Sequence, residues 1–148
     1  MEKTVEVTRG RLEKLAEMVL KSLVPLSEKK AVFIALHGDL GSGKTSFVKE
    51  VAKILEIKED VISPTFILKK EYEVKLLEVE KLIHVDAYRL MSPKEGRVLL
   101  LDEDDKPKRI IFIEWPEHIE KRKWDAELHF TYVSEEIRRV SVKVRQNS

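Results

Sequence analysis

Apolar positions change their spacing along the chain, and each spacing predicts a different element. Between residues 12 and 23 they recur at helical intervals, with Thr8 as a predicted cap and Pro25 at the end. Residues 31–36 are apolar without interruption, which favours a strand covered on both faces. Helical spacing returns over residues 46–55. The first third of the chain therefore predicts helix, buried strand and helix.

Two later apolar runs also predict buried strands, and each run ends in a carboxylate. Residues 82–85 lead to Asp86, and residues 110–113 lead to Glu114. A hairpin is predicted just before the first run, over residues 73–81. Both carboxylates are thus expected at the carboxyl ends of strands.

The remaining segments predict one more helix, a turn and a hairpin. Ser92 starts the helix as its cap, with Pro93 in the first turn and Glu95 closing a capping box. Residues 102–107 are rich in carboxylates and predict a solvated turn. Alternation of apolar and polar residues over 128–144 predicts a closing antiparallel hairpin.

A glycine-rich stretch joins the buried strand to the second helix. Its sequence, Gly38-Asp39-Leu40-Gly41-Ser42-Gly43-Lys44-Thr45, fits G-x-x-x-x-G-K-[ST] without a gap. Glycines let backbone N–H groups turn toward a phosphate, and the helix start adds the positive end of its dipole. Lys44 is expected to reach the β- and γ-phosphates, and the Thr45 hydroxyl to bind Mg²⁺. The predicted phosphate site comprises Asp39, Leu40, Gly41, Ser42, Gly43, Lys44, Thr45 and Ser46.

Taken in order, these elements predict an α/β fold of the P-loop NTPase type. It is a mainly parallel sheet flanked by helices, with antiparallel edge strands. A length of 148 residues predicts one P-loop ATPase domain over residues 1–148. The active site is then expected at the carboxyl ends of the strands.

Mg²⁺ on a phosphate needs a carboxylate beside the loop, and Asp86 and Glu114 both qualify. The sequence does not decide which of the two binds the metal directly. Thr65 is a candidate for a switch-like residue that touches Mg²⁺ or the γ-phosphate, with a rigid helix-to-strand turn as the alternative. His84, inside an apolar run, is predicted to be a packed, hydrogen-bonded core histidine rather than a catalytic one.

Composition narrows the function classes. The chain has 28 Lys and Arg against 27 Asp and Glu, a net charge of +1, which gives no electrostatic basis for strong autonomous nucleic-acid binding. It has no cysteine, so disulfides and thiolate metal sites are excluded. No apolar run reaches the length of a membrane span, and residues 1–6 lack the apolar core of a signal peptide. A cytoplasmic protein without a membrane partner is therefore expected.

Four motifs, in this order along the chain, resemble the bacterial TsaE family of small ATPases. They are Gly38–Thr45, Ser63–Phe66, His84–Leu90 and Ile113–Glu117. The resemblance implies ATP and Mg²⁺ as cofactors and a role in threonylcarbamoyl modification of the tRNA adenosine next to the anticodon. It also implies the TsaD–TsaB heterodimer as partner, with tRNA contacted only indirectly or within that complex.

The resemblance also implies roles for single residues. Lys44 and the loop backbone would hold the phosphates, Thr45 and Glu114 would bind Mg²⁺, and Asp86 would lie near the metal or the attacking water. The implied catalytic set is then Asp86, Glu114 and Lys44. Two further implied positions are Thr65 in a switch-like loop and Trp115 against the site.

Two other functions are compatible with the same phosphate loop. A small-molecule P-loop kinase would transfer phosphate to an acceptor, whereas an ATPase releases it. A non-hydrolytic, ATP-dependent assembly switch would need Lys44 and would tolerate loss of Glu114 or Asp86. The sequence has no N-K-x-D after the loop, which argues against a guanine-specific GTPase.

Overall fold

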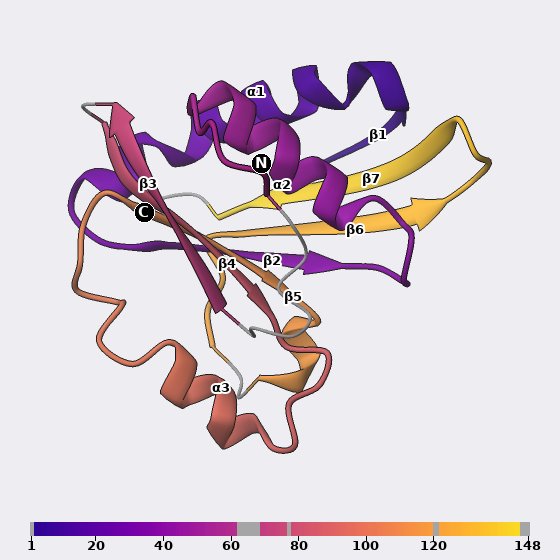
Figure 1. The fold of residues 1–148 in the computed structure, drawn as a ribbon. Helices are drawn as coiled ribbons and strands as arrows, with labels where there is room; N and C mark the ends of the chain where they lie inside the picture. The colour runs from indigo at the N-terminus through magenta and orange to yellow at the C-terminus, as the bar shows by residue number, and fades with distance from the viewer. Residues whose placement is uncertain (1, 62–68, 77, 120–121, 146–148) are drawn as a thin grey trace.

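Seven strands form one mixed sheet with helices on both of its faces in the computed structural model (Figure 1). The structure describes residues 2–61, 69–76, 78–119 and 122–145. The strands are β1 (Glu2–Thr8), β2 (Val32–His37), β3 (Lys69–Leu76), β4 (Val79–Asp86), β5 (Arg109–Glu114), β6 (Ala126–Tyr132) and β7 (Ile137–Val144). The α-helices are α1 (Leu12–Leu23), α2 (Lys44–Ile54) and α3 (Pro93–Leu99), and short 3-10 turns include η1 (Arg9–Arg11) and η3 (Pro116–His118).

The centre of the sheet is parallel and its margins are antiparallel. The spatial order is β1-β7-β6-β2-β5-β4-β3. Strands β4, β5, β2 and β6 run parallel to one another. At the margins, β3 is antiparallel to β4, β7 is antiparallel to β6, and β1 is antiparallel to β7. The predicted α/β fold, with a mainly parallel sheet and antiparallel edge strands, is confirmed. The hairpin before β4 and the closing hairpin of β6 and β7 are confirmed with it.

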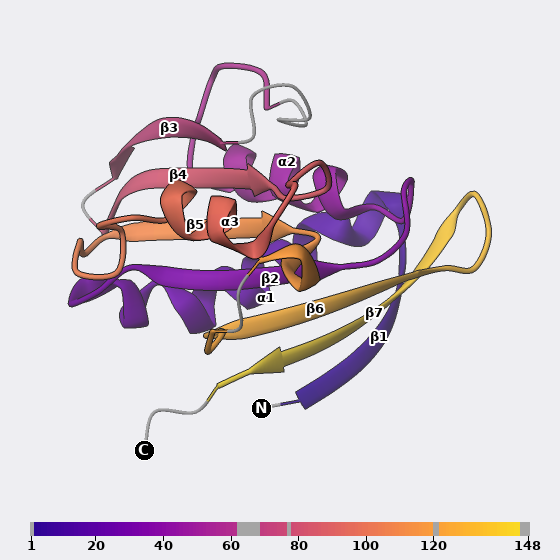
Figure 2. The same ribbon diagram turned by 90° about the horizontal axis from the view of Figure 1, so that it is seen from below.

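Alternate residues of the central strands pack into two separate cores, because successive side chains of a strand point to opposite faces. Ile34, Leu82 and Ile110 pack with α1 and α2. Phe33 and Ile111 belong to the second core, on the side of α3. Figure 2 shows the sheet between α3 on one face and α1 and α2 on the other. This double burial explains why the run over residues 31–36 is continuously apolar.

Helix α3 begins where the sequence predicts, although its cap differs. Ser92 is the N-cap residue and makes no side-chain capping bond. A capping box would join the Glu95 carboxylate to the Ser92 amide. The carboxylate instead accepts a hydrogen bond from the Met91 amide at 3.3 Å, so the predicted capping box is wrong. A Cβ on Gly96 would lie 2.8 Å from the Ile119 side chain. Gly96 therefore allows α3 to pack closely on the segment after η3.

Two other local predictions differ from the structure: the cap of the first helix is wrong, and the predicted acidic turn forms with every residue except Glu103 exposed. Thr8 caps the 3-10 turn η1 without a side-chain bond, and α1 starts later, at Leu12. Glu103, in the acidic turn that was expected to be solvated, is only 3% exposed. It pairs with Lys69 at 3.2 Å and Arg109 at 2.8 Å. Burial would raise the pKa of Glu103, but these two cations outweigh burial and lower it.

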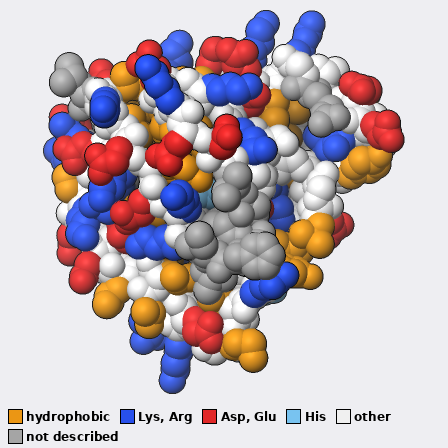
Figure 3. Space-filling view, viewed as in Figure 1, with side chains coloured by type: hydrophobic (Ala, Val, Ile, Leu, Met, Phe, Trp, Pro, Cys, Tyr) orange, Lys and Arg blue, Asp and Glu red, His pale blue; other side chains and the backbone are white. Residues whose placement is uncertain are grey.

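The surface agrees with the balanced charge. Lysine, arginine, aspartate and glutamate side chains alternate across the face drawn in Figure 3. Over the part of the chain that the structure describes, no helix is both long and apolar enough to cross a bilayer.

Candidate functional site

Three parallel strands end side by side and bring the candidate site residues together. Register places Glu114 opposite both Leu36 on β2 and Asp86 on β4. Asp86 and Glu114 are 5% and 4% exposed, so both carboxylates are held at the sheet edge with little access to bulk water. Because the phosphate loop leaves the end of β2, it lies beside them.

The phosphate loop depends on glycine at three positions. Gly38, Gly41 and Gly43 have φ angles of 146°, 76° and 111°, a region that other residues rarely adopt. A Cβ on Gly38 would also lie 2.7 Å from the carbonyl oxygen of Phe130 on β6. The loop is thus built around bare backbone, as a phosphate cradle requires.

Lys44, the first residue of α2, is folded back over its own loop. Its ammonium donates to the carbonyl of Gly38 and lies 4.1 Å from the centre of the Trp115 ring. Burial lowers the pKa of Lys44, and the carboxylates of Glu114 and Asp86 oppose that effect. A buried ammonium beside carboxylates is a cation prepared to pair with phosphate oxygens.

Glu114 links the loop to the core histidine. The Thr45 hydroxyl donates to Glu114 Oε2 at 3.2 Å, and His84 Nε2 lies 2.5 Å from the same oxygen. The prediction of a packed, hydrogen-bonded His84 is confirmed, since this residue is fully buried. Among the described residues, His84 Nδ1 and Ser42 Oγ have no hydrogen-bond partner although both are buried.

The oxygen groups at the strand ends fit the preferences of Mg²⁺. Asp86 accepts a hydrogen bond from the Tyr88 amide at 2.9 Å, which fixes its carboxylate. Together with the Thr45 hydroxyl and Glu114, this gives hard oxygen donors of the kind that Mg²⁺ selects. The donor set is therefore suitable for a metal that bridges protein and phosphate.

Trp115 closes the site from the side of β5. Its backbone is left-handed, with φ of 58°, which is costly for a bulky residue and is often found at functional sites. The ring lies 4.9 Å from Tyr88 and 5.7 Å from His118, centre to centre. Of this aromatic cluster, Trp115 covers the Lys44 ammonium, whose residue is only 4% exposed.

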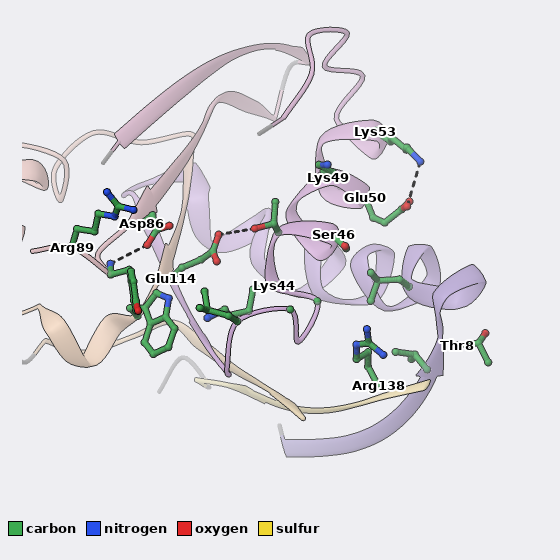
Figure 4. Close-up of a pocket in the computed structure, with 18 residues that line it drawn as sticks. Thr8, Lys44, Ser46, Lys49, Glu50, Lys53, Asp86, Arg89, Glu114 and Arg138 are labelled. Atoms are coloured by element: carbon green, nitrogen blue, oxygen red, sulfur yellow. Dashed lines mark hydrogen bonds and ion pairs between the residues drawn. The ribbon is translucent and has the colours of Figure 1, made fainter. Parts of the chain in front are cut away.

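A cavity of about 630 Å³ contains these groups (Figure 4). The predicted site residues that line it are Leu40, Gly41, Gly43, Lys44, Thr45, Ser46, Asp86, Glu114 and Trp115. Asp39 is exposed on the loop, and Ser42 is buried beneath it. Thr65 lies outside the described residues.

The cavity continues past the loop to residues that sequence reasoning missed. Val7, Thr8 and Leu12 come from β1 and α1, Lys49, Glu50 and Lys53 from α2, and Arg138 from β7. Figure 4 shows Arg138 and Thr8 on the side of the loop away from Asp86. The guanidinium of Arg138 lies 4.6 Å from the Tyr132 ring, and its Nε has no partner among the described residues. No local motif marks Val7 and Arg138, because the pairing of β1 with β7 brings them together.

A sequence profile of the family described as "Threonylcarbamoyl adenosine biosynthesis protein TsaE" matches residues 6–142. The chain belongs to the TsaE family. The matched range contains the phosphate loop, both strand-end carboxylates and Arg138. The expected family is therefore confirmed.

Curated relatives with the TsaE name agree. The tRNA threonylcarbamoyladenosine biosynthesis protein TsaE of Aquifex aeolicus is 43% identical over 107 residues, which are 66% of this chain and 74% of that protein. The Haemophilus influenzae protein of the same name is 33% identical over 105 residues, 71% of this chain and 62% of the relative. The Bacillus subtilis TsaE is 40% identical over 89 residues, which are 60% of this chain and 53% of that protein. The matched segment thus spans little more than half of some relatives.

A solved structure shares the fold. The crystal structure of Bacillus subtilis YdiB superposes with a TM-score of 0.63 and covers 97% of this chain and 87% of that chain. Sequence identity between the two is 22%, so this similarity concerns the fold alone. The TsaE-family chain therefore has the architecture expected from its sequence pattern.

Proposed function

We propose that this chain is a Mg²⁺-dependent ATPase that serves threonylcarbamoyl modification of tRNA. The observation that carries the proposal is the convergence of Thr45, Glu114 and Lys44 at one end of the cavity. A hydroxyl and a carboxylate in contact, next to a buried ammonium and a glycine-rich turn, form the set that phosphoryl transfer requires. Membership of the TsaE family supports a role of this chemistry in threonylcarbamoyladenosine biosynthesis.

The loop and Lys44 act on the phosphates. With a nucleotide bound, the backbone amides from Asp39 to Ser46 would surround the β-phosphate, and the Lys44 ammonium, which now donates to the Gly38 carbonyl, would pair with phosphate oxygens. Because Lys44 is buried against Trp115, its charge is little screened by water. Tight, preorganised pairing with the charge that develops during hydrolysis is the result.

The metal contacts are assigned to Thr45 and Glu114, which already touch each other at 3.2 Å. When bound, Mg²⁺ supplies neutralisation of the charge on the phosphate oxygens. His84 holds Glu114 in place through a short contact of 2.5 Å. Asp86, fixed by the Tyr88 amide, would orient the attacking water. Thr65 stays a predicted contact of Mg²⁺ or the γ-phosphate.

The far end of the cavity receives the nucleoside. Val7 and Leu12 offer apolar contact, and the Arg138 guanidinium, with its unpaired Nε, offers a planar cation that can stack on a base. The cavity of about 630 Å³ is within the usual size range for such a ligand.

The proposed partner is the TsaD–TsaB heterodimer, with tRNA contacted only through that complex. A net charge of +1 and the mixed surface in Figure 3 support indirect contact with tRNA. The partner is also expected to raise the hydrolysis rate, because a group supplied from another protein is commonly worth about 10³–10⁵ in rate.

Release of phosphate from ATP tests the proposal. Purified chain, alone and with TsaD–TsaB, is assayed in Mg²⁺ beside Glu114→Ala. We expect slow hydrolysis alone, a rise with the partner, and loss of that rise in the variant. No binding to the pair and no stimulation would contradict the partner assignment.

The same assay separates the two alternatives. Phosphate that appears on a small acceptor rather than in solution identifies a kinase. Modification activity of TsaD–TsaB that survives Glu114→Ala and fails in Lys44→Ala identifies an assembly switch without hydrolysis. The proposed ATPase predicts neither result.

A further inference from the structure

A second group of potential metal ligands lies on the face of the sheet opposite α2. His37, Glu127 and His129 each offer one ligand atom, and these atoms lie within 4.8 Å of one another. Strand alternation places them there, because Leu36, Leu128 and Phe130, between or beside them, pack in the core with α1 and α2. His37 and His129 are register partners across parallel β2 and β6.

The distances within this cluster match those between ligands of one metal ion. His37 Nε2 lies 3.1 Å from Glu127 Oε1. With Zn–N and Zn–O lengths of about 2.0–2.2 Å, two ligands of a tetrahedral Zn²⁺ are separated by about 3.4 Å. The imidazole of His129 stacks on that of His37 with ring centres 4.1 Å apart and planes 3° apart. The ligand atoms of all three groups are thus close enough to bind one ion.

A fourth residue lies where an orienting group is found in metal sites. A histidine that binds metal through one nitrogen usually donates its other N–H to a carboxylate. Glu117 Oε2 lies 3.7 Å from His37 Nδ1, on the side of the ring away from Glu127. This carboxylate would fix the ring and raise the basicity of the nitrogen that faces the metal.

We propose that His37, Glu127 and His129 form a site for a divalent transition-metal ion, with Zn²⁺ as the representative ligand. Imidazole and carboxylate suit Zn²⁺, Co²⁺ and Ni²⁺, whereas Mg²⁺ prefers oxygen alone. Three protein ligands leave one position for water, as in zinc sites with an open coordination position. The site is separate from the nucleotide cavity, and its existence does not depend on the proposed ATPase activity.

Binding requires one local movement. A metal lies in the plane of each imidazole that binds it, so two parallel rings cannot both reach it without tilting. His129 is exposed, and its ring is free to turn away from the stack.

The site touches both sides of the phosphate loop. His37 directly precedes Gly38, and Glu117 lies on η3, directly after Pro116 in the turn that begins at Trp115. A metal that ties β2, β6 and this turn together would stiffen the base of the loop. Occupancy is therefore expected to change nucleotide affinity without contact to the nucleotide.

Calorimetry with Zn²⁺, on metal-free full-length chain without nucleotide or Mg²⁺, tests the proposal. We expect one Zn²⁺ per chain, an affinity at least about tenfold weaker in His37→Gln and His129→Gln, and about tenfold weaker in Glu117→Gln. His118→Gln is the matched control, because His118 lies nearby outside the cluster, and it should bind as the wild type does. Absorption of Co²⁺ in the visible range reports nitrogen ligation independently.

Two results would overturn the site. One is Zn²⁺ affinity that is unchanged in both His37→Gln and His129→Gln while circular dichroism shows folded protein. The other is Zn²⁺ binding that disappears in Glu114→Gln, since the ion would then occupy the nucleotide cavity. Failure of ATP hydrolysis alone leaves this test unaffected.

Discussion

The two ends of the cavity are built from different parts of the sheet. At one end, parallel β2, β4 and β5 stop together and present Lys44, Asp86 and Glu114, all nearly buried. At the other end, the antiparallel β1 and β7 bring Val7 and Arg138 to the same space. The first end holds charges in fixed geometry, whereas the second offers an apolar surface and one planar cation.

This difference assigns distinct tasks to the two ends. Charges that are buried and braced by hydrogen bonds suit chemistry, because they need no reorganisation when charge develops on a substrate. Stacking surfaces and exposed cations suit recognition, because each contact adds a modest amount of affinity. Changes at the parallel end should therefore affect turnover strongly, and changes at the antiparallel end should affect the choice of ligand.

Lys44→Ala should have the largest effect. Loss of a buried cation that pairs with phosphate costs about 2–5 kcal/mol, so hydrolysis should fall about 1000-fold and tripolyphosphate binding should weaken together with ATP binding. Phosphate release and calorimetry measure both. Lys53→Ala is the control, because Lys53 lines the cavity, is exposed and pairs only with Glu50 among the described residues. If Lys44→Ala and Lys53→Ala lost hydrolysis and tripolyphosphate binding equally, the two ends of the cavity would not have separate tasks.

Glu114→Gln should come next. The amide keeps the size of the side chain but removes the charge of the proposed metal ligand, so Mg²⁺-dependent hydrolysis should fall about 100-fold while Mg²⁺-free nucleotide binding changes little. Hydrolysis is measured over a Mg²⁺ titration. Glu50→Gln, on α2 in the same cavity, should leave the Mg²⁺ dependence unchanged. A wild-type Mg²⁺ profile in Glu114→Gln would remove Glu114 from the metal site.

Arg138→Ala should separate the two ends directly. Loss of the planar cation should weaken ATP binding about tenfold and leave tripolyphosphate binding unchanged, because the latter has no base to stack. Competition between ATP and tripolyphosphate measures the ratio of their two affinities. Arg139→Ala is the matched control, since the neighbouring side chain pairs with Glu6 at 2.7 Å and does not line the cavity. If Arg138→Ala weakened the binding of ATP and of tripolyphosphate equally, Arg138 would contact the phosphates and not the base.

Alkaline pH should produce the smallest change. Burial lowers the pKa of Lys44, so its charge is lost at a lower pH than in an exposed lysine. Phosphate binds the charged form, and affinity for both ATP and tripolyphosphate should therefore fall several-fold as pH rises through that pKa. Calorimetry between neutral and alkaline pH, with Lys44→Ala as reference, measures the part of the affinity that depends on the Lys44 charge. An affinity fall of equal size in Lys44→Ala would assign it to another group.

The sequence predicts the phosphate end better than the far end for a physical reason. Gly38 to Thr45 are contiguous, and their spacing itself encodes the turn. Asp86 and Glu114 were predicted as strand ends because buried strands are continuously apolar. In contrast, Val7 and Arg138 are separated by most of the chain, and the β1 and β7 pairing that brings them together has no local signal.

The neighbours of some polar groups were also hard to predict. Glu103 stands among acidic neighbours and was expected to be solvated, yet its partners Lys69 and Arg109 come from other strands. His37 and His129 are likewise adjacent only through the parallel pairing of β2 and β6. Residue type shows what such a group can do, whereas long-range pairing decides whether it is buried.

The close contact between Gly38 and the Phe130 carbonyl has a mechanical consequence. The start of the loop lies against β6, and a Cβ added to Gly43 would lie 3.7 Å from the Phe130 ring. The stiffness of the loop is thus inherited from a strand that contributes no group to the phosphates. Shortening or destabilising the hairpin of β6 and β7 would therefore make the phosphate loop more mobile before the parallel strands of the sheet unfold.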